Sequence, residues 1–287
     1  MSSSEPVAPN IKSQRLDHYV LASYPELSRS YAARLIDEAK VLVNGTVSKP
    51  GYKLRVSDVV TIEYNPTEEH RIPDIDLPIL YQDDDVIVIN KPVGIISHAR
   101  GRYWDEPSVA SFVRQITGQP GERAGIVHRL DRATSGVMIC AKNQATLSLL
   151  QRQFSDRKVK KTYTAIVSGH IKPPQAIIDM PIERNPKAPS TFRVGNNGKP
   201  AQTKYTVVLS NGAYDKLILE PATGRTHQLR VHLSYRGHPI VGDSLYQGVQ
   251  AERLYLHAYE LTISIPKAGV MTFTAPLPEE FNELVAD

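Results

Sequence analysis

An acidic, proline-rich stretch at residues 65–85 divides the chain into two unequal parts. It carries one basic and seven acidic side chains, for a net charge of −6, and three prolines. Proline has no amide hydrogen and favours an extended backbone, so such a stretch is typical of a linker rather than of a domain interior. We therefore predict a module at residues 14–64, a linker at 65–80 and a main domain at 81–287.

The negative charge of this stretch hides a basic main domain. The 287-residue chain has a net charge of only +4, but residues 12–64 carry a net +2 and residues 86–287 a net +9. An excess of basic side chains favours a polyanionic partner such as a nucleic acid, without identifying it.

Composition also excludes several classes of protein. With Cys140 as its single cysteine, the chain cannot form an intramolecular disulfide or a cysteine-rich metal site. No apolar run reaches the roughly 20 residues needed to span a bilayer, and the polar first residues lack an apolar signal region. We therefore expect a cytoplasmic protein with no membrane partner.

The N-terminal part has the pattern of a small α+β module behind a tail of 13 residues. Leu16, Tyr19 and Val20 recur at helical spacing, and a second helix is predicted to run toward Lys40. Short strands are predicted at residues 41–43 and 59–64, because both segments are rich in β-branched side chains.

Basic side chains around this module are candidates for RNA binding, although surface lysines and arginines are more often only solvated. The candidates are Arg29, Arg34, Lys40, Lys49 and Lys53.

The module resembles the RNA-binding domain of ribosomal protein S4 in the order of its short motifs. These motifs are Arg15-Leu16-Asp17, Ser28-Arg29-Ser30, Leu35-Ile36, Val41-Leu42-Val43-Asn44-Gly45 and Ser57-Asp58-Val59-Val60. The resemblance implies that the module binds RNA. The sequence departs from that family at Ala39-Lys40 and at Ser57, where glycine is usual.

Strands outnumber helices in the main domain and do not alternate regularly with them. Strands are predicted at residues 85–90, 126–131, 137–141, 162–168, 203–210 and 216–220, and helices begin near Val109, near Leu147 and at Thr226. This pattern predicts an α+β fold with a largely antiparallel, mixed sheet.

Three stretches of the main domain carry the side chains that chemistry would need. In His128-Arg129-Leu130-Asp131, a strand would place Arg129 and Asp131 on one face and Leu130 in the core. An aspartate beside an arginine on a rigid element is a candidate reactive carboxylate. A surface ion pair is the simpler alternative.

The second stretch is Gly224-Arg225-Thr226-His227-Gln228-Leu229-Arg230, in which a helix capped by Thr226 would present Arg225 to a cleft. A solvated helix face is the alternative for Arg230 and His232. His227 and His232 are five residues apart, which does not match a helical zinc pair, so we predict no metal site. In the third stretch, Tyr163 begins a strand behind a basic run; the alternative is an edge-strand aromatic.

These stretches, in this order, resemble the RluA family of RNA pseudouridine synthases over residues 80–280. The matching motifs are Asn90-Lys-Pro-Val-Gly94, His128-Arg-Leu-Asp131 with Thr134-Ser-Gly136, Lys161-Thr-Tyr-Thr-Ala165, Gly224-Arg-Thr-His-Gln-Leu-Arg230 and Gly237-His-Pro-Ile-Val-Gly-Asp-Ser-Leu-Tyr246. The resemblance implies the pseudouridine synthase fold, and an isomerisation that needs no cofactor and no metal.

The resemblance also implies a role for individual residues. Asp131 matches the catalytic aspartate, and Arg225 matches the arginine that pairs with it. Tyr163 matches the active-site tyrosine beside the uracil, and Arg129 the arginine that fills the gap left by the flipped nucleotide. Leu229 matches an apolar residue near the base.

The implied reaction detaches uracil from C1′ of ribose, rotates it and rejoins it through C5. The carboxylate either attacks the sugar, as glycosidase carboxylates do, or removes the C2′ proton. With its N-terminal module, the chain is similar to the two-domain members (RluC/RluD type) that modify large-subunit ribosomal RNA. The same chemistry on transfer RNA, and a non-catalytic RNA-binding or ribosome-assembly factor, are the alternatives. We expect a monomer.

Overall fold

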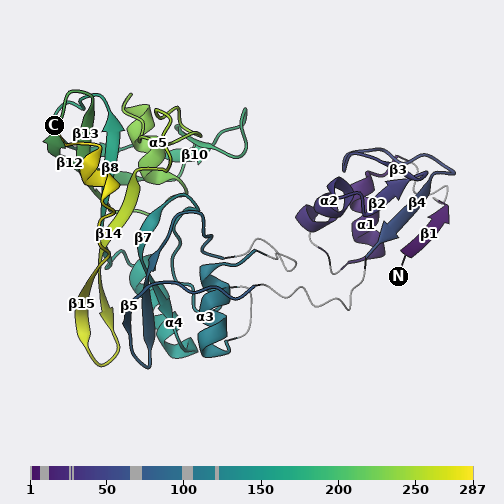
Figure 1. Cartoon of the computed structure of the whole chain (residues 1–287), viewed down its shortest axis with the longest axis horizontal. Helices are drawn as coiled ribbons and strands as arrows, with labels where there is room; N and C mark the ends of the chain where they lie inside the picture. The colour runs from purple at the N-terminus through teal and green to yellow at the C-terminus, as the bar shows by residue number, and fades with distance from the viewer. Residues whose placement is uncertain are drawn as a thin grey trace. The chain divides into compact units, whose positions relative to one another are not determined.

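The computed structural model describes residues 2–6, 13–25, 27, 29–64, 73–98, 106–119 and 123–286. These residues divide into two compact units, one in the N-terminal part and one built from residues 74–98 and 107–286 (Figure 1). Residues 65–72 of the predicted linker and Ser28 lie outside the described residues. In the described ranges, no helix is both long and apolar enough to cross a membrane.

The N-terminal unit packs two helices against a four-stranded antiparallel sheet, with the strand order β1-β4-β2-β3. The elements are α1 (Leu16–Ser23), α2 (Arg29–Asp37), β1 (Ser2–Pro6), β2 (Val41–Val43), β3 (Thr46–Val47) and β4 (Val59–Glu63). Leu16, Val20 and Ile36 are fully buried in its core. Both predicted helices and both predicted strands are present. Two strands were not predicted: β3, which pairs with β2, and β1, which pairs with β4 where only a tail was expected.

Two departures from the S4 pattern occur where the backbone is left-handed. Ala39 has a φ of 60° and Ser57 a φ of 78°. Glycine adopts this conformation without strain, and other residues only at a cost. The module therefore has a left-handed backbone at both positions, as glycine would, although the residues there are alanine and serine.

The larger unit is built on a nine-stranded mixed sheet with the order β5-β6-β7-β14-β8-β13-β12-β9, and β15 pairs with β14 (Figure 1). The strands are β5 (Ile79–Gln82), β6 (Val86–Lys91), β7 (Ser135–Ala141), β8 (Lys160–Ser168), β9 (Gln175–Asp179), β12 (Gln202–Ser210), β13 (Tyr214–Pro221), β14 (Leu256–Ile265) and β15 (Gly269–Thr274). Within this sheet β7 and β14 pair in parallel and the other pairs are antiparallel, which confirms the predicted α+β class.

Helices and a small hairpin complete this unit and leave two hydrophobic cores along the sheet. The elements are α3 (Val109–Thr117), α4 (Gln144–Ser155), α5 (Gln228–Tyr235), α6 (Glu280–Glu283), β10 (Ile182–Arg184) and β11 (Phe192–Val194). Phe112 and Leu150 lie in the core built on β6 and β7, whereas Leu229 and Leu233 lie in the core built on β8 and β13. Tyr163 packs against both cores, so it marks their junction.

Two predicted elements differ from the structure. The predicted strand 126–131 is an irregular loop with a single bridge from Ile126 to Cys140. The backbone of Leu130 forms hydrogen bonds with a side chain and not with a neighbouring strand. The Ser97 hydroxyl accepts a hydrogen bond from Leu130 N–H and donates one to Leu130 C=O. The end of the predicted linker also folds with the larger unit, because Leu77 is buried in its core and Ile79 begins β5.

Candidate active site

A cleft at the junction of the two cores contains all five residues that the sequence suggested for chemistry or base binding. Its volume is about 110 Å³. Asp131 and Arg129 reach it from the loop before β7, and Tyr163 reaches it from β8. Arg225 lies in the turn before α5, and Leu229 lies in the first turn of that helix. Sequence segments almost 100 residues apart therefore meet in one cleft.

Lys91 contacts the backbone of the loop that carries Asp131. The ammonium of the fully buried Lys91 donates to the carbonyls of Pro92 and Ile95 at 2.8 Å, and to that of Arg132 at 3.4 Å. Burial lowers the pKa of Lys91 to about 7, against the opposing charge of Asp131. Gly136 is the second residue of β7, and a Cβ at this position would lie 2.2 Å from the Ala258 carbonyl oxygen. Glycine therefore allows the start of β7 to approach β14.

The arginine that faces Asp131 is Arg230, and the predicted pairing with Arg225 is wrong. Arg230 Nη1 lies 3.4 Å from Asp131 Oδ2. Its other nitrogens bind both oxygens of the buried Asp243, at 2.8 and 2.7 Å. Burial by itself would lower the pKa of Arg230, but the hydrogen bonds and charge of Asp243 outweigh it and raise that pKa. Arg230 is thus a fixed cation between two carboxylates.

Arg225 lies in the same cleft but points its Nε to the Pro200 carbonyl oxygen, at 3.0 Å. The cause is Gln228, whose side-chain oxygen accepts from Arg225 N–H at 3.0 Å and from the Thr223 hydroxyl at 2.7 Å. Its amide nitrogen donates to the Gln202 carbonyl at 2.9 Å. Gln228 therefore ties the turn before α5 to β12 and directs Arg225 away from Asp131.

His227 also faces Asp131, with its Nε2 3.8 Å from Asp131 Oδ2. Its Nδ1 lies 2.8 Å from the hydroxyl of Tyr246, and that hydroxyl accepts the backbone N–H of Phe192 at 2.9 Å. Burial lowers the pKa of His227, against the charge of Asp131, so the ring is neutral at pH 7. Because the Tyr246 oxygen already accepts one hydrogen bond, we expect its own proton to be donated to Nδ1, which would leave the ring proton on Nε2, toward Asp131.

Comparison with known proteins shows the family to which the chain belongs. The sequence pattern of a family described as RNA pseudouridylate synthase matches residues 85–235, more than half of the chain, and the pattern of the S4 domain matches residues 14–60. The chain belongs to the RNA pseudouridylate synthase family. The synthase is therefore an isomerase, and both resemblances that its motifs suggested are confirmed.

Relatives of the synthase match it over most of their length. It is 38% identical to a ribosomal large subunit pseudouridine synthase D of Borreliella burgdorferi, over 93% of this chain and 87% of the relative. It is 34% identical to the protein of the same name in Escherichia coli strain K12, over 97% and 92%. Among solved structures, human RNA Pseudouridylate Synthase Domain Containing 1 is similar with a TM-score of 0.60 and 31% identity, covering 70% of this chain and 83% of that one.

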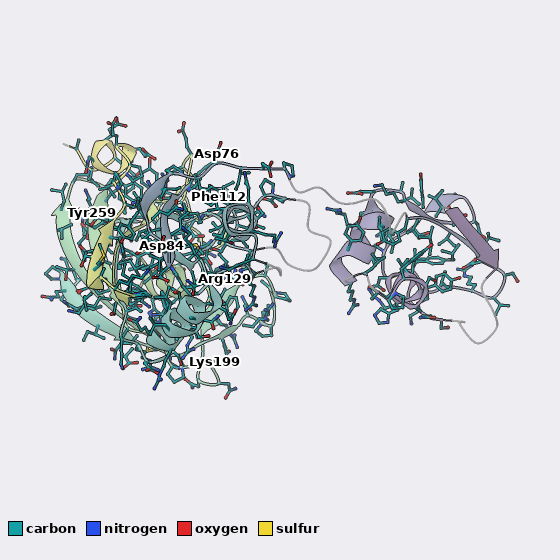
Figure 2. All side chains as sticks on the ribbon, turned by 90° about the horizontal axis from the view of Figure 1, so that it is seen from below. Asp76, Asp84, Phe112, Arg129, Lys199 and Tyr259 are labelled. Carbon is teal, nitrogen blue, oxygen red and sulfur yellow. The ribbon has the colours of Figure 1, made fainter. Side chains whose placement is uncertain are left out.

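Other side chains of the cleft differ in exposure and charge. Tyr163 is half-buried, and burial together with the charge of Asp131 raises its pKa, so its phenol keeps its proton at neutral pH. Leu229 is 5% exposed, whereas Arg129 is exposed at the surface of the unit (Figure 2). In the part of the chain that the structure describes, no three His, Cys, Asp or Glu side chains are grouped as a metal site requires.

Sequence reasoning missed four residues of the synthase that face Asp131 or hold those that face it, namely His227, Arg230, Asp243 and Tyr246. A signal for Arg230 existed, because it lies in a short helix between Leu229 and Val231, both of which are apolar. All residues from Gln228 to Leu233 are buried, and a buried arginine needs a carboxylate. Asp243 comes 13 residues later in an apolar segment, and no local pattern connects the two.

Proposed function

We propose that the synthase converts uridines of large-subunit ribosomal RNA to pseudouridine, with Asp131 as the catalytic carboxylate. The names of the relatives support the choice of RNA. The S4 pattern and the net charge of +9 in residues 86–287 support binding to an RNA backbone. A ribosomal substrate agrees with the expected cytoplasmic location and with action as a monomer.

The arrangement around Asp131 carries this proposal. Its Oδ2 faces both Arg230 and His227, while Oδ1 has no such partner within the described ranges. Oδ1 is then the oxygen that attacks C1′ of the ribose or removes the C2′ proton, and Arg230 orients the carboxylate. Reaction through a bond to the sugar resembles the role of a glycosidase carboxylate.

The walls of the cleft support binding of a flipped uracil. A protonated, half-buried Tyr163 fits packing against the base better than acting as a general base, which would require a pKa near the working pH. Leu229, which lies in the core built on β8 and β13, also lines the cleft. Removing a base from its stack costs a few kcal/mol, and the exposed Arg129 offsets part of it by filling the gap.

We also propose that residues 14–64 bind RNA and that the main domain carries the chemistry. Three of the candidate RNA-binding side chains are exposed, namely Arg29, Lys49 and Lys53. The other two form ion pairs with the Glu38 carboxylate, with N–O distances of 3.5 Å for Arg34 and 3.6 Å for Lys40. Deleting residues 1–64 should weaken RNA affinity or change the choice of site without abolishing isomerisation. A truncated protein that folds and binds a short substrate but cannot isomerise it contradicts this division.

Mapping pseudouridine in total RNA tests the proposal. Cells without the gene should lose pseudouridine at one or more positions of large-subunit ribosomal RNA, and the wild-type gene should restore it. The Asp131→Asn variant should bind RNA like wild type but restore nothing. Loss only in transfer RNA would overturn the choice of RNA, and full activity of Asp131→Asn would overturn the role of Asp131.

A further inference from the structure

A second hollow adjoins the cleft, and four cationic side chains line it. They are Arg129, Arg157, Lys161 and Arg225. The two hollows share wall residues, among them Lys161, Tyr163 and Gly224, so they are continuous. No aspartate or glutamate lines the second hollow among the residues that the structure describes.

None of the four cations is paired with a carboxylate in the described part of the chain. The Nε of Arg225 donates to a neutral carbonyl, and the ammonium of Lys161 has only the Thr223 carbonyl, at 3.5 Å. Some arginines of this unit do contact a carboxylate, since Arg230, Arg253 and Arg193 each do so at 2.7 Å. What distinguishes the four cations is that they line one hollow together, without an acidic side chain among its lining residues.

The burial of Lys161 is energetically unfavourable when no anion occupies the hollow. Its side chain is half-buried at the start of β8, and burial lowers its pKa. Burying a charge without a partner is unfavourable. An anion in the hollow would remove this penalty.

We propose that Arg157, Lys161 and Arg225, three of the side chains of this four-cation pocket, bind a backbone phosphate of the substrate RNA next to the flipped uridine, which leaves Arg129 to fill the gap in the stack. This inference rests on the proposed function, because continuity with the Asp131 cleft is what places the phosphate beside the reacting nucleotide. It also gives Arg225 a role as a phosphate ligand. Guanidinium groups suit this role, since their planar donors match phosphate oxygens.

Salt-dependent binding of a large-subunit ribosomal RNA transcript tests the pocket, with Asp131→Asn as the background so that binding is separated from chemistry. Lys161→Gln and Arg157→Gln should each make the slope of log affinity against log salt shallower by roughly 0.7 to 1, the value for one lost phosphate contact. Lys172→Gln, which removes an exposed charge outside the pocket, is the matched control. Equal slopes for all three variants would overturn the proposal.

A second measurement needs no substitution. Acetylation of lysines in the wild-type protein, read by mass spectrometry, should show Lys161 protected at least fivefold by the transcript and Lys172 unprotected. Inorganic phosphate at millimolar concentration should protect Lys161 much less, and equal protection would instead indicate a site for free phosphate. Unchanged Lys161 labelling with RNA contradicts the proposal even if the protein isomerises uridine, and protection without isomerisation contradicts only the proposed function.

Discussion

The two units contain opposite arrangements of arginine and aspartate. In the N-terminal unit, one buried carboxylate, Asp17, binds two partly exposed arginines: Arg15 at 2.9 Å and Arg29 at 3.1 Å. In the larger unit, one buried guanidinium, Arg230, lies between the carboxylates of Asp243 and Asp131. The first arrangement presents positive charge to solvent, and the second presents a negative group to a cleft.

This difference shows how one ion-pair chemistry serves two tasks. A buried carboxylate that holds two arginines fixes cations for a polyanion. A buried arginine anchored on one carboxylate fixes a second carboxylate for reaction at a sugar. In both, the buried partner holds the more exposed one in place, and we propose that the more exposed partner meets the ligand. The following predictions test this assignment, beginning with the largest effect.

Removing the anchor of Arg230 should have the largest effect on stability. Asp243→Asn leaves a buried guanidinium without its carboxylate, so the free energy of unfolding should fall by about 3–5 kcal/mol. In the double variant Arg230→Met with Asp243→Leu, apolar packing should recover much of that loss, but activity should stay absent. Urea denaturation and tritium release from C5-labelled uridine measure the two effects. A stable, active double variant would show that Arg230 is only structural.

Shortening the reach of Arg230 should reduce turnover more than binding. Arg230→Lys keeps the charge but loses the planar fork that contacts Asp243 and Asp131 together, so kcat should fall by about 100-fold with little change in KM. Arg236→Lys, at the end of the same helix, is the matched control, since the Arg236 side chain donates only to the Lys172 carbonyl. A change in KM alone would assign Arg230 to RNA binding instead.

Removing the hydroxyl of Tyr246 should have a smaller effect on the same carboxylate. Tyr246→Phe keeps the ring under Arg230 but releases Nδ1 of His227, so the imidazole loses its fixed tautomer. We expect kcat to fall about tenfold, and ¹⁵N NMR of the imidazole to change from Nε2-protonated to mixed. Tyr255→Phe, another buried tyrosine of this unit, is the control. An unchanged tautomer would remove His227 from the arrangement.

The fold class was predicted from local sequence patterns, and the ordered motifs that resemble the family supplied the five candidate residues that line one cleft. Sequence reasoning failed where long-range contacts decide. The loop at residues 126–131 is irregular because Ser97, distant in sequence, takes over the hydrogen bonds of Leu130. Arg225 and Arg230 are five residues apart in one motif, and only Gln228 and Asp243 determine which of them faces Asp131.

The smallest expected effect concerns Asp17 and acid pH. Hydrogen bonds from Arg15 lower the pKa of Asp17 to about 2, below its usual value near 3.8. A carboxyl whose pKa is depressed on folding contributes stability above its unfolded pKa, and the contribution is lost as the pH falls through the folded value. Asp17→Asn should therefore lower the urea midpoint of residues 13–64 at pH 7, followed by their amide NMR signals, and the difference from wild type should disappear between about pH 4 and pH 2. If the difference persists at pH 2, Asp17 acts through packing and not through the charges that it holds, and the comparison between the two units fails.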